Sequence, residues 1–398
     1  MRPLSSRLSV LTGEGALSVY LRAKELERQG KSVIHLELGE PDFHPAEPVV
    51  AALEKAVRDG KDRYCPMAGL PALKEEIAAY LHRTRNISVA PENVVVAPGC
   101  KLSLFFALMT IVEPGDEILW PDPGFPGYAS ITRGFGGMPV SFGLEEKNQL
   151  QPDPVEIAAK ITPRTKAILL NSPCNPTGTV YTDQVQRRIA ELAVQHDLYV
   201  LSDEIYARII YGDQYTSMLS YPGMAERTLI IDGFSKSFAM TGWRLGYTIA
   251  PPELVPHLVM LAVNSYTCTA EFTQYAAIEA LRDSTGATPR MVAEFRKRRE
   301  QFIGDLNRVP GFRCIPPAGA FYAWVNIDET GMSAEEVCRI MLEEAGVAAI
   351  AGAAFGDMGK NFVRFSFASS TATLKEAVAR IQRASAVWQR EIAIHQTT

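Results

Sequence analysis

Cysteine is scarce in this chain, and its spacing gives no sign of a shared site. The six cysteines among 398 residues never form a CxxC pair; they are Cys65, Cys100, Cys174, Cys268, Cys314 and Cys338. Scattered thiols of this kind are typical of a protein in a reducing compartment. We therefore expect a cytoplasmic protein with free cysteines and without a metal site.

Long apolar runs and an excess of positive charge are also missing. The longest apolar run, residues 104–112, is much shorter than the roughly 20 residues that a membrane-spanning helix needs. The first 15 residues lack the continuous apolar core of a secretory signal. The net charge of −5 does not favour a surface for nucleic acid or anionic lipid. We expect neither nucleic acid nor a membrane as a partner.

The composition that remains is that of an ordinary globular protein. The chain is 47% hydrophobic and 21% charged, and its length allows two or three domains with cores of their own. Short apolar segments alternate with helical ones, and the predicted strands are 94–97, 117–120, 166–170, 198–202 and 228–232. This alternation predicts an α/β fold with a mainly parallel sheet covered by helices on both faces.

The pattern differs at the two ends of the chain. Helical periodicity predicts helices at 16–30, 46–59 and 71–84, with a short strand at 33–38 between the first two. A helical tract covers 253–308, and strand-like segments follow at 319–325 and 361–367. We expect a large domain at 46–285. The segment 1–45 is expected to join a smaller α+β domain at 286–398.

The most informative segment is GFSKSFAMTGWRLG, residues 233–246, which follows the predicted strand 228–232. A lysine at a strand end, such as Lys236, can be held in place and partly desolvated. Desolvation lowers the pKa of an ammonium group and frees the amine to form a Schiff base. Arg244 follows eight residues later and can bind a phosphate with two parallel hydrogen bonds. An imine-forming lysine beside a phosphate-binding arginine is what pyridoxal phosphate (PLP) requires.

This segment resembles the lysine signature of the class I/II, fold-type I PLP-dependent aminotransferases. The matching residues are Gly233, Phe234, Ser235, Lys236, Gly242, Arg244, Leu245 and Gly246. The family often has serine where this chain has Gly233, so phosphate binding is expected to depend more on Arg244, a helix start and Ser235. The resemblance continues in the expected order from Gly39 to Arg364. It implies a fold-type I enzyme that moves an amino group between an L-amino acid and a 2-keto acid by a ping-pong Schiff-base mechanism.

Polar residues recur where predicted strands end, which is where open α/β sheets bind ligands. In Ala97-Pro-Gly-Cys-Lys a strand passes into a helix, whose free N–H groups and dipole attract anions. Gly99, Cys100 and Lys101 are therefore predicted to face the cofactor phosphate.

The resemblance implies four further cofactor contacts. Phe125 would stack on the pyridine ring, Asn175 and Tyr206 would hydrogen-bond the ring oxygen O3′, and Asp203 would pair with the ring nitrogen. A carboxylate there keeps the ring protonated and makes it a better electron sink. Lys236, Asp203 and Tyr206 are the expected catalytic residues, with Lys236 moving the substrate α-proton as general base and then as acid.

Substrate and partner contacts also follow from the resemblance. Arg364 would grip the substrate α-carboxylate in a planar bidentate pair, close to Asn175 and the backbone of Gly39. Tyr64 matches a tyrosine that reaches the phosphate of the neighbouring subunit, which implies a homodimer. Glu14 lies in the segment that often covers the substrate side chain, and we hypothesise that it favours a neutral or basic side chain over a dicarboxylate.

Two other functions compete with transamination. The cofactor motifs do not determine the fate of the substrate carbanion, so a β-lyase, a cyclase or synthase, or an oxidase of the same fold has the same signature. A non-catalytic PLP-binding module, such as the effector domain of a transcription regulator, needs an added DNA-binding domain. We expect none, because the family pattern begins close to the first residue. A purely structural role leaves Lys236, Asp203 and Arg364 unexplained.

Overall fold

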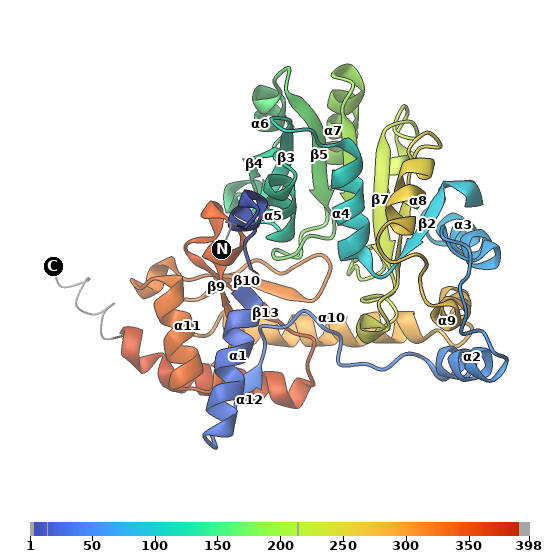
Figure 1. The fold of residues 1–398 in the computed structure, drawn as a ribbon. Helices are drawn as coiled ribbons and strands as arrows, with labels where there is room; N and C mark the ends of the chain where they lie inside the picture. Colours follow the sequence, from blue (N-terminus) through green and yellow to red (C-terminus); the bar gives the residue numbers. More distant parts are fainter. Residues whose placement is uncertain (1–3, 14, 213–214, 390–398) are drawn as a thin grey trace.

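The computed structural model describes residues 4–13, 15–212 and 215–389, and it contains two main sheets (Figure 1). Helix α1 (Gly15–Arg28) lies beside the C-terminal helices rather than against the large sheet (Figure 1). The boundaries expected near residues 45 and 285 stay predictions. None of the helices in the described part of the chain has the length and apolarity that crossing a lipid bilayer requires.

The large sheet has seven strands in the order β2-β8-β7-β6-β5-β3-β4. Strand β8 is antiparallel to both of its neighbours, β2 and β7, and all the other neighbouring pairs are parallel. The strands are β2 (Val94–Ala97), β3 (Glu117–Asp122), β4 (Met138–Gly143), β5 (Thr165–Asn171), β6 (Tyr199–Asp203), β7 (Thr228–Gly233) and β8 (Gly246–Ile249). The prediction of an α/β fold with a mainly parallel sheet is confirmed.

Helices cover both faces of this sheet because the strands are apolar on both sides. In β5, Ile168 and Leu170 pack into the hydrophobic cluster of one face, and Ala167 and Leu169 into that of the other. The first face carries α6 (Pro154–Lys160) and α7 (Asp183–Gln195), and the second carries α4 (Cys100–Ile111), α5 (Gly127–Gly134) and α8 (Val255–Val263). A strand buried on both faces has a continuous apolar sequence, which is the pattern on which the sheet was predicted.

A third group of helices packs on the β2–β8 edge of the large sheet. It comprises α2 (Glu47–Arg58), α3 (Pro71–Arg85) and α9 (Glu271–Arg282). The helical tract predicted at 253–308 is therefore not continuous: it consists of α8, α9 and α10 (Ala287–Leu306). Gly286 precedes α10 with a φ of 65°, a left-handed conformation that separates α10 from α9.

The smaller part of the molecule is built on a four-stranded sheet of order β12-β13-β10-β9. Its strands are β9 (Arg313–Cys314), β10 (Tyr322–Asn326), β12 (Ile350–Ala351) and β13 (Phe362–Ser366), and its helices are α10, α11 (Ala334–Glu343) and α12 (Thr371–Ala384). The strand expected at 33–38 is only two residues long, β1 (Ile34–His35), and it pairs with β11 (Val347–Ala348). This pairing ties the N-terminal segment to the C-terminal part of the chain.

Candidate functional site

Three neighbouring strands of the large sheet end beside one another and carry polar residues there. Asn171 and Asp203 are the last residues of β5 and β6 and lie opposite each other in register. Lys236 follows β7, and Cys100 begins α4 just beyond β2. These ends meet a cavity of about 320 Å³, at the edge where parallel sheets bind ligands.

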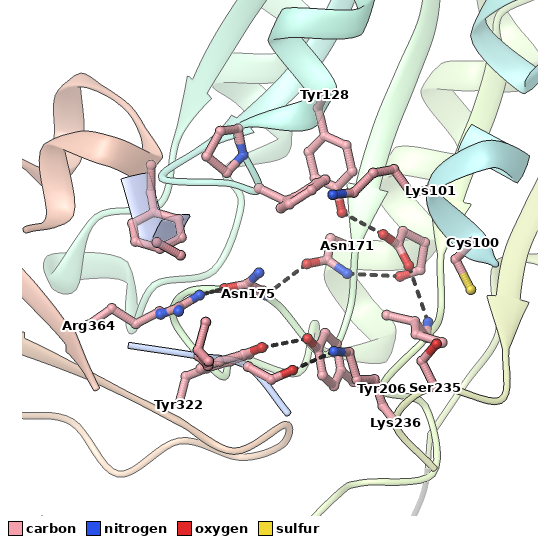
Figure 2. Close-up of a pocket in the computed structure, with 18 of the residues that line it drawn as sticks. Cys100, Lys101, Tyr128, Asn171, Asn175, Tyr206, Ser235, Lys236, Tyr322 and Arg364 are labelled. Atoms are coloured by element: carbon pink, nitrogen blue, oxygen red, sulfur yellow. Dashed lines mark hydrogen bonds between the residues drawn. The ribbon is translucent and has the colours of Figure 1, made fainter. Parts of the chain in front are cut away.

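The cavity also receives residues from the smaller part of the molecule, among them Tyr322 and Arg364 (Figure 2). All residues predicted for the site line it except Gly99 and Tyr64. Gly99 lies directly before the lining residue Cys100. Tyr64 is 86% exposed and lies outside the cavity, and Glu14 lies outside the described residues.

Lys236 is held inside the cavity by the N-terminal segment. Its Nζ donates a hydrogen bond to the carbonyl oxygen of Gly39, so residues almost 200 positions apart meet at the reactive amine. Burial lowers the pKa of Lys236 to about 8 because an ammonium group loses its hydration there. A substantial fraction of the amine is then neutral near physiological pH, as nucleophilic and general-base chemistry require.

Asp203 is a carboxylate with hydrogen-bond partners but, among the described residues, without an ion-pair partner. The hydroxyl of Tyr128 donates to Oδ2 at 2.7 Å, and the N–H of Ile205 donates to Oδ1 at 3.2 Å. Burial raises the pKa of Asp203 to about 6, although both hydrogen bonds act in the opposite direction. A cation placed beside this carboxylate would favour its charged form.

Arg364 lies on the other side of the cavity with its guanidinium between two aromatic rings. The ring centres of Tyr322 and Phe355 are 4.6 and 4.8 Å away. Nη1 donates to Oδ1 of Asn175 at 2.9 Å, and Nη2 donates to the carbonyl oxygen of Glu37. A planar cation fixed in this way is suited to bind a carboxylate.

The start of α4 and Arg244 form a concave surface that suits an anion. Gly99, the N-cap residue of α4, has a φ of 94°, and a Cβ atom there would lie 2.6 Å from Nη2 of Arg244. The close approach puts the guanidinium against the N-terminal end of the helix, where N–H groups and the helix dipole add positive potential. Ser235 lines the same cavity, as does Lys101, whose Nζ is 5.5 Å from the ring centre of Phe125.

The glycine at position 233, where the family often has serine, has a steric reason. A Cβ atom on Gly233 would lie 2.8 Å from Sγ of Cys100 and 2.7 Å from Cα of Gly246. The Cys100 side chain and the backbone of Gly246 thus occupy the space that a larger residue at position 233 would need.

Sequence reasoning missed several residues of the cavity. Asn171 opens the Asn-Pro segment and donates from Nδ2 to the backbone oxygen of Asp203 at 3.1 Å. Tyr128 closes the Pro-Gly-Phe-Pro-Gly-Tyr segment, so a signal was present for both. Tyr322 and Phe355 come from the smaller part of the chain, and no local motif marks them.

A buried charge network lies behind the cavity. Arg85, at the end of α3, donates from Nη1 to Glu204 at 2.7 Å and from Nη2 to Asp232. Glu204 directly follows Asp203, and Asp232 lies near the end of β7, four residues before Lys236. One guanidinium therefore joins the ends of the two strands that carry the predicted catalytic residues.

The lowered pKa of Lys236 predicts how stability depends on pH in the cofactor-free protein. Its ordinary pKa of 10.5 falls to about 8 on folding, so the unfolded chain binds more protons between these values, and stability from this group rises with pH there. Below pH 8 the desolvated ammonium of Lys236 is destabilising. We expect Lys236→Met to stabilise the protein by about 1–3 kcal/mol at pH 7, with the gain fading by pH 10.5. Urea unfolding of both proteins at several pH values measures this; a gain that does not change with pH would contradict it.

Comparison with known proteins agrees with this geometry. Residues 31–381 match the family described as aminotransferase class I and II. An aspartate aminotransferase of Pyrococcus abyssi is 40% identical over 89% of this chain and 92% of its own. The aspartate/prephenate aminotransferase of Thermus thermophilus is 38% identical over 96% of this chain and 99% of its own. The solved aspartate aminotransferase from Thermus thermophilus with maleate has a TM-score of 0.92 at 36% identity, covering 96% of this chain and all of that one. The chain belongs to the class I and II aminotransferases and is an enzyme of that family.

Proposed function

We propose that this aminotransferase binds PLP in the cavity around Lys236 and exchanges the amino group of an L-amino acid with a 2-keto acid. The observation that carries the proposal is a desolvated lysine amine with the carboxylate of Asp203 and the buried guanidinium of Arg364 on the walls of the same cavity. When bound, PLP supplies an aldehyde for the lysine amine and a ring that accepts the electrons released at the substrate α-carbon.

The residues of the cavity fit this cofactor. The surface formed by the start of α4, Ser235 and Arg244 suits its phosphate. Asp203, which has no ion-pair partner among the described residues, suits a protonated ring nitrogen, and Phe125 suits the ring face. Asn175 and Tyr206 offer an amide group and a hydroxyl to the ring oxygen.

The chain's own groups then supply binding and proton transfer. Arg364 holds the α-carboxylate of the amino acid and so orients its α-C–H bond toward Lys236. The neutral Nζ of Lys236 would take the proton from the substrate α-carbon as general base and would later return it as general acid. Desolvation of Lys236 favours that neutral form. Apolar side chains also line the cavity; they are Leu38, Leu104, Ile350 and Ala354. Such surface reduces the amount of water around the reacting groups.

Arg364→Leu should lower kcat/KM for the amino acid by on the order of 100-fold or more, because two hydrogen bonds to a charged carboxylate are lost. Arg364→Lys keeps the charge but loses the planar pair of donors. Its kcat/KM should therefore lie between those of the wild type and Arg364→Leu. Steady-state kinetics with aspartate and 2-oxoglutarate measure this, and cofactor absorbance confirms that each variant is loaded. If Arg364→Leu retains normal kcat/KM, the carboxylate is bound elsewhere.

Aspartate is the first donor to test, because relatives at 36–40% identity carry the name aspartate aminotransferase. The hypothesis that Glu14 favours a neutral or basic side chain predicts a different ranking. A panel of amino acids with 2-oxoglutarate or pyruvate as acceptor, run on the wild type and on Glu14→Gln, decides between them. Stoichiometric amination of the acceptor is expected, whereas ammonia release or oxygen uptake would point to another reaction.

We also propose a homodimer in which Tyr64 reaches the cavity of the partner. Its side chain is 86% exposed, which leaves it available for contact with a second copy of the chain. The mass of the particle in solution and the cofactor affinity of Tyr64→Phe test this.

The free state of all six cysteines supports a reducing compartment such as the cytoplasm.

A further inference from the structure

Tyr322 lies between two groups to which the proposed mechanism gives separate tasks. It is on β10, diagonally across from Arg364 on β13, since Trp324 is the residue paired with Arg364. Its ring centre is 4.6 Å from the Arg364 guanidinium. Its hydroxyl is 2.6 Å from the hydroxyl of Tyr206 (Figure 2). One side chain with 1% exposure thus contacts both the predicted carboxylate site and the predicted ring-oxygen site.

We propose that Tyr322 is a positioning residue that orients the Tyr206 hydroxyl toward the cofactor with its own hydroxyl and holds Arg364 with its ring. The proposal rests on the proposed PLP site. It assigns two tasks to two separable parts of one side chain, the hydroxyl and the aromatic face.

The hydroxyl task follows from counting protons. Each phenol has a single O–H group, so in the pair Tyr206–Tyr322 only one hydroxyl donates to the other. If Tyr206 is to donate into the cavity, it must accept from Tyr322. Burial holds the pKa of Tyr206 well above its ordinary value, so Tyr206 keeps the proton that it would donate. A hydroxyl that accepts one hydrogen bond also donates more strongly, because the two bonds polarise each other.

The position of the Tyr322 hydroxyl is itself tightly constrained. A Cβ atom on Gly39 would lie 2.1 Å from this hydroxyl, so the hydroxyl packs directly on the backbone of the segment that accepts the hydrogen bond of Lys236. Any side chain at position 39 would displace it. The glycine in Leu-Glu-Leu-Gly-Glu-Pro-Asp is therefore needed at this position because it leaves space for the Tyr322 hydroxyl.

The ring task follows from the stacking around Arg364. Tyr322 and Phe355 flank the guanidinium at 4.6 and 4.8 Å, distances within the range of favourable cation–π contacts. Stacking restricts rotation of the guanidinium plane while Asn175 fixes one end of it. Tyr322→Phe keeps this face and loses only the hydroxyl, whereas Tyr322→Leu loses both.

These variants give distinct expected results in the PLP-loaded enzyme. For Tyr322→Phe we expect kcat to fall about three- to tenfold, the effect of one hydrogen bond, with KM for the amino acid within twofold of wild type. The pH at which the bound cofactor's visible absorbance titrates should rise, because a weaker donor at the ring oxygen makes that oxygen hold a proton more readily. Tyr322→Leu should show the same changes and, in addition, a rise in KM of about threefold or more, because the ring face that contacts Arg364 is lost. Phe355→Leu is the matched control, since it removes the other face and should raise KM without moving the absorbance titration.

A double-mutant cycle with Tyr206→Phe tests whether Tyr322 acts through Tyr206. In the Tyr206→Phe background, Tyr322→Phe should change neither kcat nor the absorbance titration further. Additive effects of the two substitutions, or a Tyr322→Phe enzyme with an unchanged titration, would overturn the proposal. A wild-type protein that develops no visible absorbance with PLP would instead contradict the proposed function itself, so the two failures are distinguishable.

Discussion

Lys236→Ala should lower kcat for transamination by on the order of 10⁴-fold or more, because it removes the general base and also the amine that anchors the cofactor. The lysine is partly buried just beyond the end of β7, and its lowered pKa of about 8 suits it to both tasks. Steady-state rates with aspartate and 2-oxoglutarate measure the loss.

The matched control is Lys297→Ala, which removes a lysine with a 77% exposed side chain and should leave kcat within twofold of wild type. Unfolding experiments on Lys236→Ala separate a chemical effect from a folding defect, since the small side chain is expected to leave the fold intact. A Lys236→Ala enzyme that keeps more than a tenth of the wild-type rate would contradict the assigned role.

Arg85→Leu should destabilise the protein by about 3–5 kcal/mol, the usual effect of removing one partner from a buried ion pair. Both carboxylates of the network are buried: Glu204 also accepts from the hydroxyls of Ser202 and Ser217, and Asp232 accepts from Tyr247. Without the arginine their charges stay buried and uncompensated. The midpoint of urea unfolding at neutral pH measures the loss.

Two further variants make this test specific. Arg58→Leu removes an arginine with a 77% exposed side chain, and because exposed ion pairs contribute little, it should cost less than about 1 kcal/mol. Adding Glu204→Gln and Asp232→Asn to Arg85→Leu should recover part of the stability, because neutral amides replace the uncompensated charges. If Arg85→Leu unfolds at the wild-type urea concentration, the network does not join β6 and β7 as described.

The features that sequence predicted well are those encoded locally. The buried strands of the large sheet have continuous apolar runs, and the residues just beyond them, Lys236, Asp203 and Asn175, stand in motifs of fixed spacing. Because parallel strands end at one edge, predicting the strands also predicted that these residues would meet. The prediction of a mainly parallel sheet and of an aminotransferase is confirmed, while the individual roles of the site residues stay predictions.

The features that sequence missed depend on packing between distant segments. Strand β4 contains Pro139 and ends at Gly143, two residue types that weaken the sequence signal of a strand. The proline is tolerated because β4 lies at the edge of the sheet. Strand β8 is only four residues long and begins at the last residue of the lysine motif, Gly246. Tyr322 and Phe355 enter the cavity only because the smaller part of the molecule packs over the strand ends, and nothing in their local sequence specifies that contact.

The proposed chemistry depends on a covalent link between one nitrogen, Nζ of Lys236, and the PLP aldehyde. Borohydride reduction of the PLP-loaded wild-type protein, followed by digestion and peptide mass spectrometry, tests it directly. We expect one phosphopyridoxyl group per chain, located on the peptide that contains Lys236. Attachment of this group to a different lysine, or its absence from the reduced protein, would show that Lys236 does not bind PLP covalently.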